Sequence, residues 1–200
     1  MFYDARSNDH GLPHDPMKAL IVPRPVGWIS SLDEGGRVNL APYSFFNAVG
    51  ERPYIVVIGS TGWKHTAGNL AATGEFVCNL ATYDLRDAVN RSSAPVPAGV
   101  DEMALAGLTP AASRLVKPPR VGESPVALEC KVLEVKRLVD LEGTETASTL
   151  LLGQVVGVHI DEGLIVDGLV DITRARPISR LGYMDYAVID EVFQMRRPQS

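Results

Sequence analysis

Cysteine is scarce in this chain, whose 200 residues include only 2. Cys78 and Cys130 lie in apolar, strand-like stretches, EFVCNL and VALECKV. They have neither Cys-x-x-Cys spacing nor a nearby histidine pattern of the kind that zinc sites use. We therefore expect two buried, reduced thiols, and neither a disulfide framework nor a bound metal.

The sequence also lacks a surplus of positive charge and a long apolar run. Its formal net charge is -5, whereas nucleic-acid binders usually show a basic surplus or stripe. Acidic residues and prolines interrupt the first thirty positions, so no apolar core of a signal peptide is present. No run approaches the roughly 18 to 20 apolar residues of a membrane span. We expect a soluble, cytoplasmic protein that binds neither nucleic acid nor membrane.

Common catalytic signatures are missing as well. The chain contains no G-x-G-x-x-G after a strand, no G-x-x-x-x-G-K-[ST], no H-E-x-x-H and no G-x-S-x-G. The sequence therefore gives no motif-based support for a standard nucleotide-binding fold, a metalloprotease or a hydrolase. No nucleophile or acid–base pair stands out, so we expect no catalytic side chain, and any redox chemistry would have to come from a bound cofactor.

Composition and length favour one domain. With 46% hydrophobic residues and a mean hydropathy of +0.05, the chain can form one sizeable core. We expect residues 1–200 to form this domain, with a polar amino-terminal arm at 1–17. The segment 91–125 carries six prolines, at positions 95, 97, 110, 118, 119 and 125, and is expected to be an elaborated loop.

Strand patterns dominate the rest of the chain. The stretch 26–32, the turn residues Asp33-Glu34-Gly35-Gly36 and the stretch 37–41 predict a hairpin, which Pro42 should end because it has no N–H to donate. Gly153 and Gly157 predict bulges or tight corners in a long strand. Further strands are expected at 54–60, 75–80, 127–138 and 149–161, and short helices at 66–72, 83–90 and within 101–108. The pattern predicts a mainly β, antiparallel barrel with short helices.

Two segments are candidates for ligand binding. In Ser60-Thr61-Gly62-Trp63-Lys64-His65-Thr66, a strand leads into the amino end of a helix, where free N–H groups and the helix dipole favour an anion. An ordinary strand-to-helix turn capped by Thr66 also explains the segment, and these residues alone favour it over an anion site. After Pro42, the segment Tyr43-Ser44-Phe45-Phe46-Asn47 offers hydroxyl, amide and aromatic groups that suit a flat polar ring, although single Ser or Asn residues often bond only to local backbone.

Several separated segments resemble one known family. RPVGWISS, NLAPYSFFNAV, SRLVKPPRVGESPVALEC and RLGYMDYAVIDEVFQM, spread roughly from Lys18 to Val192, are similar to the flavin reductase-like, FMN-binding split-barrel proteins. The resemblance implies an antiparallel split β-barrel of Greek-key type. It also implies hydride transfer from NADH or NADPH to FMN, a homodimer, and delivery of reduced flavin to a partner monooxygenase.

The resemblance also implies which residues bind FMN. Around the ring we expect Trp28, Ser30, Ser31, Asn39, Pro42, Tyr43, Ser44 and Asn47, with Ala41 beside them; around the phosphate, Ser60, Lys64, His65, Thr66 and Asn69; and from the carboxyl end, Arg180 and Tyr183, with Tyr186. Some members carry Gly-Asp-His where this chain has Ala147-Ser148-Thr149. A nicotinamide-contacting histidine is therefore not carried over.

Two alternatives stay open at this point. In the first alternative, FMN is a fixed prosthetic group that passes electrons to another acceptor without nicotinamide. In the second, the chain is a small barrel that binds a ligand and has no redox function.

Overall fold

The computed structural model describes residues 1–198. The α-helices are α1 (Met17–Leu20), α2 (His65–Thr73), α3 (Arg86–Arg91) and α4 (Glu102–Leu105), and the 3-10 turns are η1 (Glu162–Leu164) and η2 (Ile172–Arg174). The strands are β1 (Arg24–Pro25), β2 (Gly27–Leu32), β3 (Val38–Tyr43), β4 (Phe46–Glu51), β5 (Tyr54–Thr61), β6 (Glu75–Leu80), β7 (Pro110–Ala111), β8 (Arg120–Val121), β9 (Val126–Val139), β10 (Glu145–Ile160), β11 (Ile165–Val166), β12 (Leu169–Val170), β13 (Ile178–Arg180) and β14 (Tyr186–Val188).

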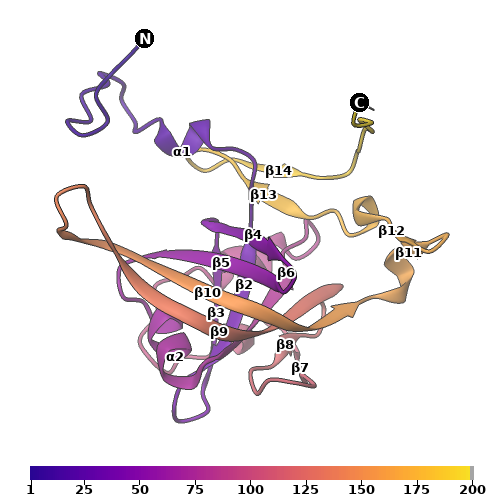
Figure 1. The fold of residues 1–200 in the computed structure, drawn as a ribbon. Helices are drawn as coiled ribbons and strands as arrows, with labels where there is room; N and C mark the ends of the chain where they lie inside the picture. The colour runs from indigo at the N-terminus through magenta and orange to yellow at the C-terminus, as the bar shows by residue number, and fades with distance from the viewer. Residues whose placement is uncertain (199–200) are drawn as a thin grey trace.

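One antiparallel sheet forms the barrel. Its seven strands follow the order β3-β2-β6-β9-β10-β5-β4, and they curl around the interior with α2 on one side (Figure 1). The two outermost strands, β3 and β4, are consecutive in the chain and are joined through Ser44 and Phe45. The prediction of a mainly β, antiparallel fold with short helices is confirmed.

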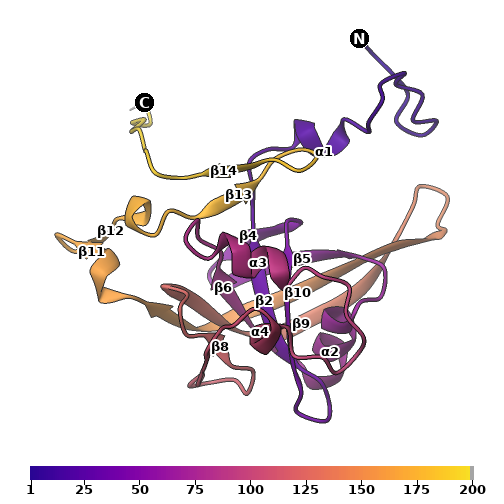
Figure 2. The ribbon, with the colours of Figure 1, turned by 180° about the vertical axis from the view of Figure 1, so that it is seen from behind.

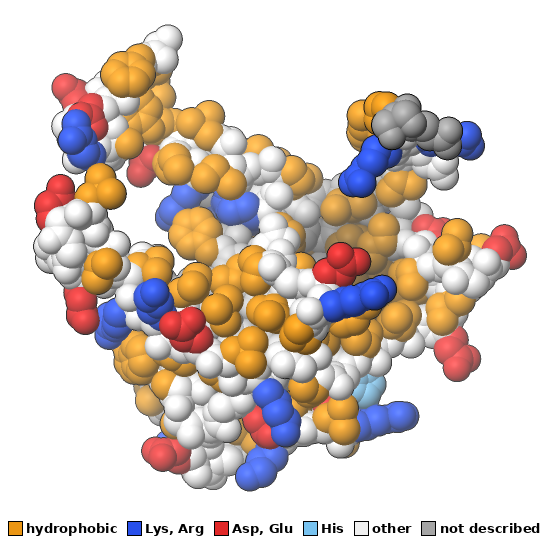
Figure 3. All heavy atoms as spheres, in the orientation of Figure 1, with side chains coloured by type: hydrophobic (Ala, Val, Ile, Leu, Met, Phe, Trp, Pro, Cys, Tyr) orange, Lys and Arg blue, Asp and Glu red, His pale blue; other side chains and the backbone are white. Residues whose placement is uncertain are grey.

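A second, smaller layer lies over one end of the barrel. It consists of α1 and the three-stranded sheet β1-β13-β14 (Figures 1 and 2). Arg24 ties this layer together, because its guanidinium donates to the carbonyls of Lys18 and Ile21 and, at 2.6 Å, to that of Leu181. Figure 3 shows a hollow between this outer layer and the barrel, with basic side chains beside hydrophobic ones.

The strand β2 is buried on both of its faces. Trp28 belongs to one apolar cluster, with Leu40 and residues of α3 and α4, whereas Ile29 belongs to another, with Phe76 and Leu70 of α2. Neighbouring residues of a strand point to opposite faces, so α3 and α4 must cover the face that carries Trp28, as Figure 2 shows. The Pro-rich segment therefore supplies part of the core.

The predicted elements agree with the structure at most positions. The hairpin turn lies between β2 and β3, and both cysteines are buried and free; burial raises the pKa of Cys78 to about 12. The expected end of the strand at Pro42 is wrong, because β3 continues to Tyr43 and Pro42 pairs with Trp28. A residue without an N–H is tolerated there because β3 lies at the edge of the sheet.

A buried carboxylate holds the Pro-rich segment against the barrel. The Glu129 side chain, on β9, is fully buried and accepts hydrogen bonds from the N–H groups of residues 114–116 at 2.8, 2.5 and 3.1 Å. His159 Nε2 lies 2.5 Å from its Oε1. Nearby, the Val121 N–H donates to Asn79 Oδ1 at 2.9 Å. The end of this long loop is therefore fixed by side chains of the sheet.

Gly153 lies where β10 shifts its register against β9, as predicted for a bulge. A Cβ at this position would lie 2.4 Å from the Phe76 ring, whereas one at Gly157 would meet the Leu115 side chain at 3.3 Å. We expect Gly153→Ala to lower the free energy of unfolding by about 1–3 kcal/mol through overpacking. Gly157→Ala should cost clearly less, because the Leu115 side chain can move. Urea denaturation of both variants tests this, and a larger loss at Gly157 would contradict it.

Candidate functional site

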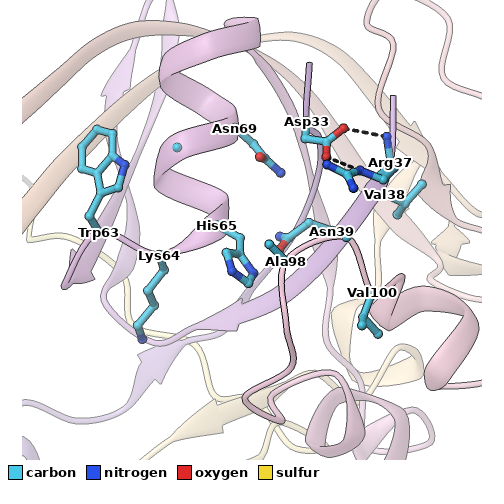
Figure 4. A pocket seen from close by; sticks show the side chains of 12 residues that line it. Asp33, Arg37, Val38, Asn39, Trp63, Lys64, His65, Asn69, Ala98 and Val100 are labelled. Atoms are coloured by element: carbon cyan, nitrogen blue, oxygen red, sulfur yellow. Dashed lines mark hydrogen bonds and ion pairs between the residues drawn. The ribbon is translucent and has the colours of Figure 1, made fainter. Parts of the chain in front are cut away.

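Three adjoining cavities form one groove beside α2, and Lys64 lines all three. The first, of about 270 Å³, lies between the β2–β3 turn, the amino end of α2 and residues 98–100 (Figure 4). The second, of about 480 Å³, lies between β3, α2 and residues 92–96. The third, of about 730 Å³, lies between the barrel and the outer layer. Each of the two larger cavities has the size of a small-molecule site.

The amino end of α2 has no side-chain cap among the described residues. Lys64 occupies the cap position in an extended conformation, and the first turn holds no acidic residue. Thr66, the expected cap, is buried and instead accepts a hydrogen bond from Asn39 Nδ2 at 3.0 Å. The backbone N–H groups of this turn, the positive end of the helix dipole and the Lys64 ammonium therefore favour an anion, as at other helix amino ends.

A buried network of amides and hydroxyls fixes α2 against the hairpin. Asn69 Nδ2 donates to Ser31 Oγ at 3.1 Å, and Asn39 bridges β3 to Thr66 of the helix. Each of these side chains therefore forms at least one hydrogen bond with another residue of the protein. The network sets the position of the α2 amino end relative to Asn39 and His65, whose side chains lie together at the cavity in Figure 4.

The Tyr43 hydroxyl is a buried polar group without a hydrogen-bond partner. Its residue is 6% exposed, and its phenol oxygen makes no hydrogen bond of good geometry among residues 1–198. Burial raises the pKa of Tyr43, while the nearby Thr66 and Ser60 hydroxyls act in the opposite direction. Lys64 Nζ lies 5.9 Å from the centre of its ring. Leaving such a group unpaired costs about 1–3 kcal/mol.

These features suit a flat compound that carries a phosphate group. The uncapped helix end with Lys64 suits a phosphate, and Pro42 and Tyr43 border a space that suits a ring. Within residues 1–198, no cluster of His, Cys, Asp or Glu is arranged to hold a metal ion. In the same span, no helix combines the length and the hydropathy needed to cross a membrane.

The structure brings most of the predicted site residues together. Those that line the groove are Asn39, Ala41, Pro42, Tyr43, Ser44, Lys64, His65, Thr66, Asn69, Arg180, Tyr183 and Tyr186. Asn47 and Ser60 instead line a fourth, mainly apolar cavity of about 490 Å³ on the side of β5 and β10, which adjoins the third cavity at Ser44 and Phe45. The binding role of every one of these residues stays a prediction.

Three predicted contacts lie in the interior instead and line none of these cavities. Trp28 Nε1 donates to Ser92 Oγ at 2.9 Å, and Ser30 Oγ donates to the Pro119 carbonyl at 2.6 Å. Ser31 Oγ accepts from Asn69, as described above. Because other segments cover both faces of β2, these polar groups form their hydrogen bonds with residues inside the protein.

Some groove residues have no clear signal in the sequence. Lys18 and Arg24 reach the third cavity from the outer layer, and Trp63 borders the first two cavities. Residues 93–96, from the Pro-rich segment, close the second cavity. Arg24 does carry one signal that sequence analysis could use, because it is a charged residue in the otherwise apolar stretch LIVPRPV.

Comparison with known proteins places the chain in a family. It matches the model of the flavin reductase like domain over residues 17–178. The uncharacterized protein BH2278 of Halalkalibacterium halodurans is 36% identical over 184 residues, which cover 89% of this chain and 87% of that protein. Nitrilotriacetate monooxygenase component B from Bacillus cereus has a TM-score of 0.88 and 30% identity, with 98% of both chains covered.

A more distant structure shows the same fold. A split barrel domain protein of Shewanella frigidimarina superposes with a TM-score of 0.82 at 21% identity, covering 98% of this chain and 94% of that one. The family model spans most of the chain, and the fold is that of a split barrel. This protein therefore belongs to the flavin reductase like domain family, as its sequence resemblance predicted.

Proposed function

We propose that this protein binds FMN in the groove and acts as an NAD(P)H-dependent flavin reductase. The observation that carries the proposal is the uncapped amino end of α2, which opens with Lys64 onto a groove that Pro42 and Tyr43 also border. Family membership supports a flavin over other phosphorylated ring compounds.

Each part of the groove has a distinct role in this proposal. The N–H groups at the start of α2, with Lys64 and His65, hold the phosphate. Asn39 and Thr66 border the path of the sugar-alcohol chain, and Pro42, Tyr43 and Ser44 border the ring. The buried network between α2 and β3 keeps these groups in place before the ligand arrives, which reduces the entropy lost on binding.

The chemistry of this site does not require a catalytic acid or nucleophile from the protein. Bound FMN would supply the redox chemistry, as the acceptor of a hydride from a dihydronicotinamide. The side chains that line the groove would bind and orient the flavin and nicotinamide rings and exclude water from the space between them. Backbone N–H groups at the edge of the flavin ring would favour the negative charge of its reduced form.

A homodimer and a partner oxygenase are part of the same proposal. Phe45 and Met184, which border the third cavity, are 47% and 85% exposed, and exposed apolar side chains around a site favour a protein contact. The name of the Bacillus cereus relative, a monooxygenase component, supports delivery of reduced flavin to an oxygenase. The cytoplasmic location stays a prediction from the sequence.

The variant Tyr43→Phe should change stability and leave FMN binding nearly unchanged. It removes a buried hydroxyl that has no partner within residues 1–198, so the free energy of unfolding should stay equal or rise by up to about 1 kcal/mol. FMN affinity should stay within about twofold, since the ring of the side chain is kept and the hydroxyl is buried. Urea denaturation and fluorescence titration with FMN measure the two effects. A clear loss of FMN affinity without a loss of stability would show that the hydroxyl contacts the ligand.

Steady-state oxidation of NADH and NADPH tests the function and separates it from the first alternative. If flavin is a substrate, the rate should rise with FMN well beyond one equivalent of protein. If FMN is instead a fixed prosthetic group that works without nicotinamide, one equivalent should bind, but neither nucleotide should be oxidised, whether excess FMN or an artificial acceptor such as ferricyanide is added. That result would contradict the proposed reductase.

A further inference from the structure

The third cavity of the groove is basic, and its cations lack acidic partners. Lys18, Arg24, Lys64 and Arg180 line it, with Asp15 as the one acidic residue. None of these residues takes part in an ion pair in the described part of the chain. Asp15 accepts a hydrogen bond from the Met17 N–H at 2.9 Å. The cavity, called the basic cavity below, therefore carries an uncompensated positive charge.

Arg24 is the most informative of these cations, because it is only 7% exposed. Its terminal nitrogens donate to backbone carbonyls, which bring no negative charge. Its Nε is buried and has no hydrogen-bond partner within residues 1–198. A buried charge without a counter-charge is costly, so the charge of Arg24 favours an anionic group in the cavity that it lines. The guanidinium also lies 6.0 Å from the centre of the Phe45 ring.

The basic cavity adjoins the proposed flavin site but has its own set of cations. Pro42, Tyr43 and Lys64 border both the second and the third cavities. Lys18, Arg24 and Arg180 line only the third of the groove cavities, and they come from the outer layer at both ends of the chain. A ligand whose ring lies near Tyr43 can therefore place a separate anionic group among these three side chains.

We propose that the basic cavity binds the diphosphate of a nicotinamide dinucleotide, with its nicotinamide end directed toward the Tyr43 side of the groove. This inference rests on the proposed function, because it assigns the hydride donor to this cavity. In the proposed function, the amino end of α2 binds the phosphate of FMN. The remaining unpaired cations match a second ligand that carries more than one negative charge and a planar ring.

Two hydride donors that differ in phosphate groups test the inference. NADH carries the diphosphate, whereas 1-benzyl-1,4-dihydronicotinamide has the same reacting ring and no phosphate. For Lys18→Gln and for Arg180→Gln, the ratio of kcat/KM with NADH to kcat/KM with the benzyl compound should fall about tenfold, since a charge-assisted hydrogen bond contributes roughly this factor. Lys136→Gln, an exposed change on β9 outside the cavities, should keep the wild-type ratio.

A second readout separates the basic cavity from the flavin site. The Kd for FMN, measured by fluorescence, should stay within about twofold of wild type in Lys18→Gln. Rising salt should lower the ratio of kcat/KM with NADH to kcat/KM with the benzyl compound. This ratio should fall more for the wild-type protein than for Lys18→Gln, because salt screens the charge that the variant lacks.

The outcomes distinguish failure of this inference from failure of the proposed function. Bound FMN that both donors reduce, with equal ratios in all variants, would overturn the diphosphate site and leave the reductase standing. An FMN Kd that rises by the same factor as the ratio of kcat/KM with NADH to kcat/KM with the benzyl compound falls would assign these cations to the FMN phosphate. That result would also overturn the diphosphate site. Bound FMN that neither donor reduces would contradict the proposed function, and this inference with it.

Discussion

Replacement of Glu129 by Ala should lower the free energy of unfolding by about 3–5 kcal/mol, because several hydrogen-bond donors lose a buried acceptor and each loss costs roughly 1–3 kcal/mol. The change removes the acceptor for three backbone N–H groups of residues 114–116 and leaves His159 without its partner. The end of the Pro-rich segment would then separate from β9. Urea denaturation at neutral pH measures the loss.

Glu75→Ala provides the matched control. Glu75 accepts a hydrogen bond from the Lys117 N–H at 2.9 Å, in the same segment, but its side chain is 21% exposed. Because water can replace this carboxylate, we expect a loss of at most about 1 kcal/mol. Equal losses in the two variants would show that the burial of Glu129 is not what makes it important.

The stability supplied by Glu129 should also depend on pH. Burial alone raises the pKa of Glu129, but hydrogen bonds from His159 and the N–H groups of residues 114 and 115 outweigh it, so the pKa lies below its ordinary value of 4.5. A carboxyl with a lowered folded pKa contributes stability above its unfolded pKa and loses it as the pH falls through the folded one. The stability difference between wild type and Glu129→Ala should therefore shrink below pH 4.5. A difference that stays constant down to pH 3 would contradict this explanation.

Lys64→Ala should weaken FMN binding about 10- to 100-fold, as expected for the loss of a charge-assisted hydrogen bond of roughly 1.5–3 kcal/mol. Riboflavin has the same ring without the phosphate, so its affinity should change less than about threefold. Lys64 is placed at the helix end by the extended cap conformation, where its charge adds to the helix dipole. Fluorescence titration with both flavins measures the effect.

Lys136→Ala serves as the control, because this exposed lysine lies on β9 away from the groove. It should leave both affinities unchanged. Equal weakening of FMN and riboflavin in Lys64→Ala would remove Lys64 from the phosphate site and would assign it to the ring or to the fold.

Local patterns in the sequence predict this fold well where neighbouring residues decide the structure. The turn at residues 33–36 follows from turn chemistry, and the strand β6, which spans its predicted residues, follows from the short apolar run EFVCNL. The register shift at Gly153 follows from a glycine within a strand. Pro42 was misjudged because whether a strand tolerates proline depends on its place in the sheet, which local sequence does not show.

The site is only partly predictable, because contacts between distant segments decide which side chains face the ligand. Trp28, Ser30 and Ser31 have the residue types of a binding site, yet the segment 86–121 and α2 cover both faces of their strand. Conversely, Arg24 and Leu181 are separated by 157 positions and meet through one hydrogen bond. No local pattern predicts that pairing, so the basic cavity cannot be predicted from the sequence alone.

The most direct test of the central claim is an absorbance titration of the purified protein with FMN, followed by anaerobic addition of NADH and then of NADPH. We expect the flavin bands to shift on binding and to bleach with at least one of the two nucleotides. Bound flavin that stays oxidised with both would contradict the reductase and favour another electron source. A protein that leaves the FMN spectrum and fluorescence unchanged would contradict the assignment of the groove.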